Sequence, residues 1–305
     1  MKHFFIIANP FKDPELETAK QIADFIIRAG GSCKIQVRGD RQPCGDAQRH
    51  NEKVRQNAEI RAQSSTYTDA AEIPPETECI LVLGGDGTLI EAARDTSGLK
   101  IPLLGINLGS LGFLTEVEKT GVTEALMQLL SDSYQIGSRM MLTGQISRNG
   151  RCPERSHALN DIVITRSGSL QIIHFHIYVN GQFLNEYNAD GVILSTPTGS
   201  TGYNMSAGGP IVEPSAKLIV ITPICPHTLN TRSIVLSAED EIVIEIAEGK
   251  KDAPFRAEVN FDGGHASPLM PGDKVIVTRS ERTTDIIKLS RASFLEVLHK
   301  KMSEK

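Results

Sequence analysis

Hydrophobic and polar positions alternate in blocks along the first third of the chain, and each block predicts one strand or one helix. The segment 15–28 places its apolar residues on one helical stripe, and 122–130 does the same. Short apolar runs, typical of buried strands, cover residues 3–8, 32–37, 79–83 and 101–106. Because strands that alternate with helices are joined by parallel crossovers, we expect an α/β domain with a parallel sheet over residues 1–133.

The pattern changes beyond residue 133, where strand signals follow one another with little helix between them. The expected strands cover residues 139–148, 157–166, 171–179, 190–195, 217–222, 232–237, 241–247, 256–262, 273–279 and 284–289. Turn signals such as Asn180-Gly181 separate them. They predict a β-rich, sandwich-like second domain over residues 134–290.

Two further segments modify this division. Residues 39–75 are polar, rich in Gln, Arg, Ala and Glu, and end in two prolines, which predicts an insertion in the first domain. A final helix is expected over residues 291–300, where its apolar side could pack back onto the first domain.

Composition narrows the class of protein. The chain has 305 residues, with 32 Lys and Arg against 37 Asp and Glu, and so lacks the basic surface that nonspecific nucleic-acid binding requires. The apolar stretches are too short or too interrupted for a bilayer span, and no signal-peptide core is present. We therefore expect a cytoplasmic protein with neither a nucleic acid nor a membrane as partner. The 5 widely spaced cysteines predict free thiols.

The strongest local signal is an apolar strand that runs directly into Gly84, Gly85, Asp86, Gly87 and Thr88. Glycines let backbone N–H groups approach an anion, and the N-terminus of a following helix favours the same charge. A carboxylate at such a place binds a metal or accepts a proton, which are both steps of phosphoryl transfer. The alternative is a plain strand-to-helix turn in which Asp86 and Thr88 are caps.

Two other segments carry polar chemistry. The segment 195–210 is dense in glycine and small hydroxyls, follows the lone acid Asp190, and offers the ring of Tyr203 to a base. Its alternative is a long connection that uses ordinary turn chemistry. Asn160 and Asp161 enter an otherwise apolar strand; taken alone, such a pair is most often a turn.

In this order, the three segments resemble the NAD kinase family. Its recognised elements are a GGDGT loop, a short Asn-acid pair and a TPTGSTAY-type segment, which match residues 84–88, 160–161 and 196–203. Diacylglycerol kinases, sphingosine kinases and phosphofructokinase relatives share the GGDGT loop, whereas the last segment is much more specific. The resemblance continues through residues 223–229 and covers most of the chain outside 39–75.

The resemblance implies ATP-dependent phosphorylation of the 2′-hydroxyl on the adenosine ribose of NAD, giving NADP, with no covalent enzyme intermediate. It also implies a divalent cation, with magnesium expected, and a homo-oligomer, either a dimer or a tetramer. Asp86 would be the general base, within a loop that includes Gly85, Gly87 and Thr88. No side chain is assigned as a metal ligand.

The resemblance also assigns the dinucleotide contacts, in the β-rich domain. Asn160 and Asp161 would hold its ribose hydroxyls, and Asp190 its nicotinamide end, with Asn188 nearby. The adenosine region would be bound by Thr201, Gly202, Tyr203, Asn204, Met205 and Ser206.

The chain departs from the family pattern at three places. An Asn-Glu pair is more usual than Asn160-Asp161, and Ala is more usual than Gly202. Some members have Arg where this chain has Asn188, which leaves the choice between NAD and NADH open. Two other functions are alternatives: a lipid kinase, which would need an apolar membrane-docking surface, and a noncatalytic dinucleotide sensor. His174 and His176 share a strand face but have no third metal ligand nearby.

Overall fold

The computed structural model describes residues 1–36, 68–109, 112–168, 171–228, 232–248, 257–264, 266–290 and 292–303. Most of the expected insertion, from residue 39 to residue 67, lies outside the described residues, as does residue 291 at the start of the expected last helix. The last part of the insertion is described and contains the short helix η1 (Ala70–Glu72).

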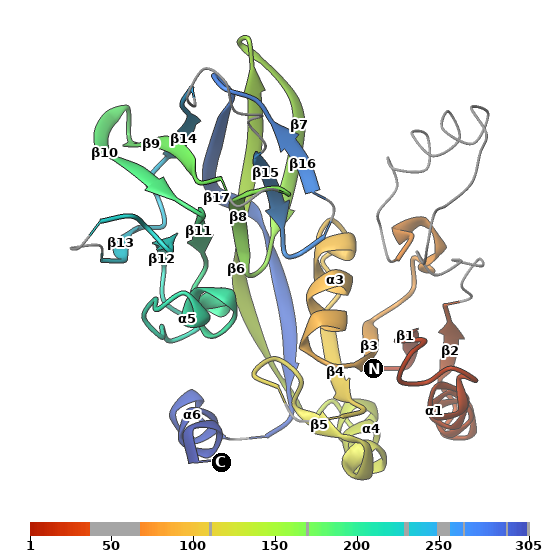
Figure 1. Cartoon of the computed structure of the whole chain (residues 1–305). Coiled ribbons are helices and arrows are strands. Elements are labelled where there is room, and N and C mark those ends of the chain that lie inside the picture. Colours follow the sequence, from red (N-terminus) through yellow and green to blue (C-terminus); the bar gives the residue numbers. More distant parts are fainter. Residues whose placement is uncertain are drawn as a thin grey trace.

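The first part of the chain forms a parallel sheet covered by helices, which confirms the expected α/β architecture (Figure 1). Its strands run parallel in the order β2-β1-β3-β4-β5. These strands are β1 (His3–Ala8), β2 (Ser32–Ile35), β3 (Cys79–Gly84), β4 (Leu103–Asn107) and β5 (Val117–Glu118). The helices are α1 (Glu17–Arg28), α3 (Asp86–Thr96) and α4 (Val122–Leu130), with the short η2 (Lys119–Gly121) before α4.

The two faces of this sheet bury different sets of side chains, as the period of two along a strand requires. From β1, Phe4 and Ile6 pack with α1 and α4, whereas Phe5 and Ile7 pack with α3. The cluster around α3 also includes Leu159, which lies beyond the first domain. Helix α3 is therefore packed between the parallel sheet and the β-rich part, and its N-terminus is held at their junction.

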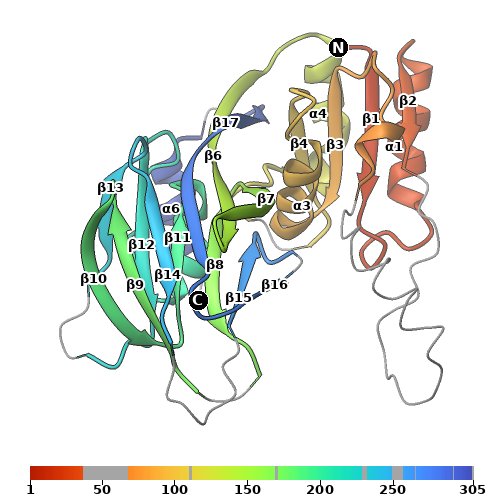
Figure 2. The same cartoon turned by 90° about the horizontal axis from the view of Figure 1, so that it is seen from above.

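The second part is built of strands in two sheets, which confirms the expected β-rich, sandwich-like architecture (Figure 2). One sheet has the order β13-β12-β11-β8-β15-β16; the other contains β10-β9-β14-β17 and joins β4 through β17. A large apolar cluster draws on both sheets. The strands are β6 (Gln135–Arg148), β7 (Arg151–Ala158), β8 (Asp161–Arg166), β9 (Ile173–Val179), β10 (Gln182–Ala189), β11 (Gly191–Ser195), β12 (Leu218–Ile224), β13 (Ile234–Ser237), β14 (Ile242–Ile246), β15 (Ala257–Phe261), β16 (Ala266–Leu269) and β17 (Lys274–Lys288).

Several strand boundaries differ from the sequence-based expectation. The expected strand 157–166 is interrupted at Leu159 and Asn160, between β7 and β8. The expected strands 273–279 and 284–289 form the single strand β17, which has an irregularity between Arg279 and Thr283. Strands β5, β10 and β16 were not expected, nor were residues 151–156 of β7. Strand β10 exposes most of its residues, β5 and β16 are short, and β7 and β16 each contain a proline.

Short helices complete the β-rich part and the chain end. They are η3 (Thr198–Thr201), α5 (Tyr203–Ser206) and α6 (Phe294–Ser303). In the view of Figure 1, α6 lies below α5. The backbone N–H groups of Leu289 and Ser290 donate to Glu116, at 3.1 and 2.6 Å, and so tie the segment before α6 to the first domain. None of the described helices is long and apolar enough to cross a membrane.

Candidate active site

The glycine bend after β3 is fixed between the carboxyl ends of the parallel strands. Strand β3 is buried throughout, Gly85 is the N-cap of α3, and Asp86 is its first residue. A Cβ on Gly84 would lie 2.4 Å from the Thr88 hydroxyl oxygen, so only glycine permits this packing. Thr88 is buried, and its hydroxyl accepts a hydrogen bond of 2.9 Å from Asn9. Thr88 thus anchors the bend to the turn that follows β1.

The Asp86 carboxylate binds the loop that joins β4 to β5, hereafter the β4–β5 loop. One carboxylate oxygen accepts the N–H groups of Phe113 at 2.7 Å and Leu114 at 3.2 Å. The other accepts the N–H and the hydroxyl of Thr115, both at 3.0 Å. A carboxylate offers about four lone-pair positions, so these donors use its whole capacity. The orientation of Asp86 is thereby determined by a loop that the sequence analysis did not select.

Gly112 makes this contact possible. A Cβ at this position would lie 1.9 Å from one oxygen of the Asp86 carboxylate and 2.2 Å from the other, so no larger residue fits while the hydrogen bonds remain. The loop and the first turn of α3 are consequently in direct backbone-to-carboxylate contact.

The Asn160-Asp161 turn is held by a second carboxylate, that of Asp262. Its oxygens accept the N–H groups of Leu159 at 2.6 Å, Asn160 at 2.7 Å and Asp161 at 3.0 Å. Asp262 has a φ of 53°, in the left-handed region. The Asp262 carboxylate therefore stabilises the turn between β7 and β8 and orients both expected site residues in it, Asn160 and Asp161.

The carboxyl groups of Asp161 and Asp262 have perturbed acidities. Asp161 is 6% exposed, and burial together with the charge of Asp262 raises its pKa to about 7. Burial raises the pKa of Asp262 to about 6, against the opposing effect of its backbone donors and of Arg94. Both carboxyl groups therefore have pKa values above the ordinary value for aspartate, for the same main cause, burial.

The glycine-rich segment is locked onto the same turn. The Thr196 hydroxyl donates to the Leu159 carbonyl at 2.6 Å, and the Thr196 N–H donates to the Asn160 carbonyl at 2.8 Å. A Cβ on Gly199 would lie 2.2 Å from that Asn160 oxygen, so the backbones approach as closely as glycine allows. The Asn160-Asp161 turn and the glycine-rich segment thus form one structural unit.

Residues 201–206 divide into an internal and an exposed set. The Asn204 side chain is buried, donates to the carbonyls of Ser200 and Pro210 at 3.1 and 3.0 Å, and accepts from the Thr222 hydroxyl at 2.7 Å. Tyr203 and Met205 are 46% and 42% exposed. Asn204 therefore stabilises the segment, while Tyr203 presents its ring to solvent.

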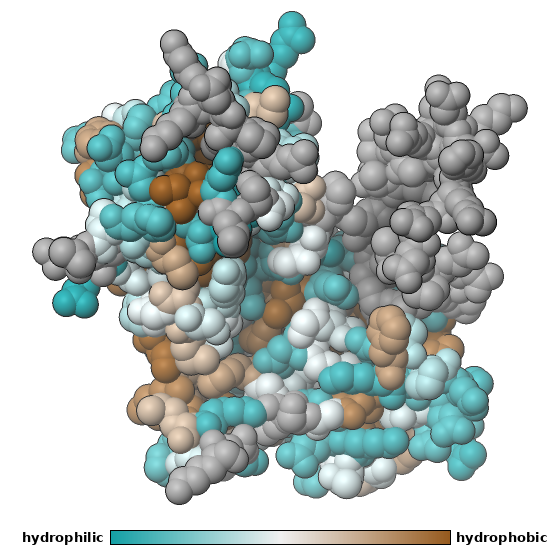
Figure 3. Space-filling model, viewed as in Figure 1, coloured by the Kyte–Doolittle hydropathy of each residue, from teal (hydrophilic) through white to brown (hydrophobic). Residues whose placement is uncertain are grey.

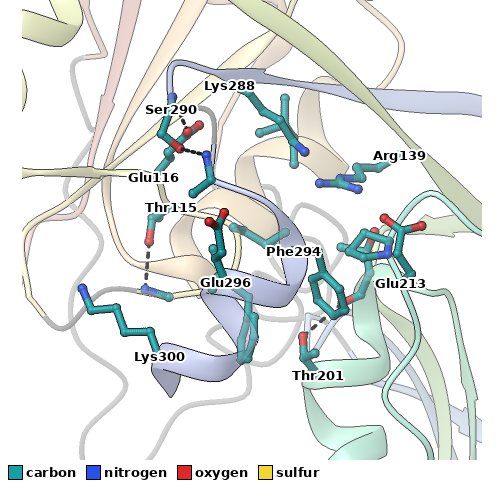
Figure 4. A pocket seen from close by; sticks show the side chains of 18 residues that line it. Thr115, Glu116, Arg139, Thr201, Glu213, Lys288, Ser290, Phe294, Glu296 and Lys300 are labelled. Carbon is teal, nitrogen blue, oxygen red and sulfur yellow. Dashed lines mark hydrogen bonds between the residues drawn. The ribbon is translucent and has the colours of Figure 1, made fainter. Parts of the chain in front are cut away.

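Two cavities lie beside this unit. The first, of about 310 Å³, is enclosed by the β4–β5 loop, β6, η3 and α6 (Figure 4). Its wall includes the expected site residue Thr201 together with Phe113, Arg139 and Phe294. The second, of about 450 Å³, is lined by Ile90, Asn160, Asp161, Val163, Thr165, Tyr203, Asn260, Asp262 and Gly263. In the space-filling view, apolar surface is visible in the hollow between the two parts of the molecule (Figure 3).

Three buried polar atoms at this site have no hydrogen-bond partner among the described residues. They are Oδ1 of Asn160, Oγ1 of Thr198 and Nε of Arg139. A buried polar atom without a partner costs about 1–3 kcal/mol, so such atoms indicate where a polar ligand is received. Burial also lowers the pKa of Arg139, while the facing carboxylate of Glu213 opposes that effect.

Asp190 and Asn188 lie apart from both cavities. The Asp190 carboxylate accepts a hydrogen bond of 2.7 Å from Arg166, and the Asn188 carbonyl accepts one of 2.8 Å from the N–H of His227. Asp190 precedes β11, whereas the glycine-rich segment follows it. At about 3.4 Å per residue, the two ends of β11 are roughly 14 Å apart, a distance that suits an extended ligand.

The described residues contain no cluster of three or more His, Cys, Asp and Glu that could hold a metal ion. His176 lies 3.8 Å from Glu186, and Figure 1 places their strands, β9 and β10, at the edge of the molecule away from α3.

One signal would have revealed the β4–β5 loop from the sequence. Carboxyl ends of neighbouring parallel strands meet at one edge of a sheet. Asn107-Leu108-Gly109 ends the apolar run that forms β4, the strand beside β3. The residues that follow these three are therefore expected at the same edge of the sheet as Asp86. For Arg139, which lies within a long strand, no local signal is evident.

Two family models match the chain, one over each of its two parts. Residues 4–134 match the ATP-NAD kinase N-terminal domain, and residues 159–289 match the ATP-NAD kinase C-terminal domain. The chain is 44% identical over 311 residues to the NAD kinase of Lachnospira eligens, covering 99% of this chain and 100% of the relative. It is 45% identical over 303 residues to the NAD kinase of Agathobacter rectalis, covering 99% of each.

Solved structures share the fold. Yeast NADH kinase complexed with NADH superposes with a TM-score of 0.77 at 24% identity, covering 99% of this chain and 87% of that chain. An NAD kinase from Archaeoglobus fulgidus in complex with ATP superposes with a TM-score of 0.71 at 21% identity, covering 100% of both chains.

Proposed function

The chain belongs to the NAD kinase family, and from that premise we propose that it transfers the terminal phosphoryl group of ATP to the 2′-hydroxyl of the adenosine ribose of NAD, giving NADP. The observation that best supports the proposal is the pair of buried, unpartnered oxygens, Asn160 Oδ1 and Thr198 Oγ1. They suit the exocyclic amine of adenine, which donates two hydrogen bonds. The first cavity beside Thr198 adds the rings of Phe113 and Phe294 as apolar walls for a base.

The ribose is proposed to bind in the second cavity, at the Asn160-Asp161 turn. Asp161 and Asn160 line the second cavity and are oriented by Asp262, so the Asp161 carboxyl group and the Asn160 amide nitrogen can meet sugar hydroxyls. Tyr203 lies on the same wall. The nicotinamide end would extend along β11 toward Asp190, which the roughly 14 Å length of that strand permits.

Asp86 is proposed to accept the proton of the attacking hydroxyl. All its lone-pair positions are in use, so one donor must leave before a sugar hydroxyl can bind. Of the four donors to Asp86, the Thr115 hydroxyl is the most easily replaced. Its oxygen accepts hydrogen bonds of 3.3 Å from the Asn107 side chain and from the Gly112 N–H, and it keeps both when a sugar hydroxyl takes its place at Asp86. The three backbone N–H groups then hold the carboxylate in place during proton transfer.

A divalent cation is proposed to arrive with ATP rather than to reside in the protein. The described residues hold no cluster of three potential ligands, and magnesium commonly binds through substrate phosphates with only one or two carboxylates. Phosphoryl transfer runs directly between ATP and the sugar oxygen, which needs positioning and charge stabilisation rather than a covalent intermediate.

Two broader properties are also proposed, the compartment and the assembly of the protein. The four described cysteines are free, which suits a reducing compartment such as the cytoplasm. Strand β10 exposes Phe183 at 58% and Leu184 at 38%, and we propose that this edge takes part in a homo-oligomer. Light scattering of the purified chain would test the assembly.

The proposed reaction is tested by incubating the purified chain with ATP, magnesium and NAD and measuring NADP with an NADP-specific dehydrogenase. NADH and diacylglycerol serve as alternative acceptors in parallel reactions. Formation of NADP supports the proposal. ATP-dependent phosphorylation of the lipid alone would favour a lipid kinase, and tight NAD binding without any product would favour a dinucleotide sensor; either result would overturn it.

A further inference from the structure

The turn after β1 places a lysine over the glycine bend. Lys12 is exposed, and its backbone N–H donates to the Asn9 carbonyl at 3.1 Å within that turn. Its Nζ lies 3.0 Å from the position that a Cβ on Gly85 would take and 3.2 Å from the corresponding position on Gly109. The ammonium group therefore sits between the residues that follow β3 and those that follow β4.

The carboxylates of Asp13 and Asp86, which are neighbours in sequence of Lys12 and Gly85, are bound to other groups. Asp13 accepts the N–H groups of Thr18 at 3.1 Å and Ala19 at 2.9 Å, at the start of α1. Asp86 is saturated by the β4–β5 loop. Among the described residues, no carboxylate lies within ion-pair distance of the Lys12 ammonium, so its charge is available to an anion.

The reaction requires such a charge. The sequence carries no GxxxxGKS/T motif, and the glycine bend 84–88 contains no basic residue of its own. Phosphoryl transfer needs positive charge on the phosphates of the donor as the transition state forms. A lysine that approaches from a neighbouring strand turn would supply what the bend lacks.

Resting on the proposed NAD kinase function, we propose that Lys12 binds the polyphosphate chain of the phosphoryl donor beside Gly85 and Gly109. Glycine at both positions leaves room for the ammonium group, whereas a side chain at either would crowd it. Lys12 thus serves the donor and not the dinucleotide acceptor, whose expected contacts lie on η3, α5 and the Asn160-Asp161 turn.

Two variants test this assignment. Lys12→Gln removes the charge, and Lys20→Gln removes an equally exposed lysine on α1 whose Nζ donates to the Glu15 carbonyl at 3.0 Å. Loss of a charge-assisted hydrogen bond should raise the KM for ATP about 10- to 100-fold in Lys12→Gln, with the KM for NAD changed less than about twofold. Lys20→Gln should match the parent, and Lys12→Arg should restore most of the affinity for ATP.

A binding measurement separates this inference from the proposed reaction. Calorimetric titration with inorganic tripolyphosphate uses a donor-like anion that has no base to enter the adenosine cavity. The parent and Lys20→Gln should bind it, and Lys12→Gln should bind it at least about tenfold more weakly. Equal binding by all three proteins, or no binding by the parent, would overturn the role of Lys12. Failure of the parent to form NADP would instead overturn the proposed function.

Discussion

Replacing Gly112 with alanine tests whether the β4–β5 loop controls Asp86. The added Cβ would lie 1.9 Å from one Asp86 oxygen and 2.2 Å from the other and from Cγ, so the carboxylate cannot keep its position. The backbone at Gly112 is not in the left-handed region, so alanine introduces no φ strain there. The clash is with the end of a side chain, which can rotate. We therefore expect a folded protein in which Asp86 points elsewhere.

The size of the effect follows from the hydrogen bonds that are lost. Asp86 is half-buried, so water replaces some of its partners and the lower end of the range for charged hydrogen bonds applies, about 1.5 kcal/mol each. Losing two of the four bonds would cost about 3 kcal/mol of positional stabilisation. If that stabilisation is used to hold the base, kcat should fall about 100-fold. The KM for ATP should change little, because Lys12 is not displaced.

The assay compares Gly112→Ala with Gly121→Ala, in which the new Cβ meets nothing within 4 Å at a φ of −92°. Steady-state NADP formation gives kcat and KM, and circular dichroism and thermal unfolding establish that both variants fold. Gly121→Ala should resemble the parent. If Gly112→Ala folds and retains the kcat of Gly121→Ala, the β4–β5 loop does not control Asp86.

Two other predictions concern the Asn160-Asp161 unit. Burial and the charge of Asp262 raise the pKa of Asp161 from 3.8 to about 7. Between these two values the folded chain retains a proton that the unfolded chain releases. The free energy of unfolding therefore falls as the pH rises from about 4 to about 7. Asp161→Asn should therefore gain in Tm relative to the parent between about pH 4 and about pH 8, whereas a constant difference would contradict the assigned pKa. A Cβ on Gly199 would meet the Asn160 carbonyl at 2.2 Å, a backbone atom that cannot rotate away, so Gly199→Ala should lower Tm and the yield of folded protein. Gly202→Ala, with its nearest contact at 3.3 Å, should leave both near the parent's values; similar losses in the two variants would show that this packing does not matter.

The sequence indicates those parts of the candidate site whose residues lie close together along the chain. The bend 84–88, the pair 160–161 and the segment 196–206 each combine their turn residues and their polar groups within a few positions. The alternation of apolar runs likewise predicted the parallel sheet, because its strands β1, β3 and β4 are buried on both faces.

The contacts that orient these parts are not local, and the sequence analysis missed them. Asp86 binds residues 27 to 29 positions further on, and Asp262 binds the N–H groups of residues 101 to 103 positions before it. Nothing in the residues around Asp262 specifies which backbone it will meet, since that depends on the pairing of β15 with β8. The strand β10 was missed for a related reason, because its stability comes from its partner β9 and not from an apolar pattern of its own.

Asp86→Asn tests whether the Asp86 carboxylate removes the proton from the ribose hydroxyl, as proposed above. The amide keeps nearly the same shape and can still accept hydrogen bonds through its oxygen, but it cannot serve as a base at neutral pH. Calorimetry should show NAD binding within about threefold of the parent, while NADP formation should fall by about 10² to 10⁴. A variant that binds NAD normally and still forms NADP at a rate close to the parent's would contradict the claim.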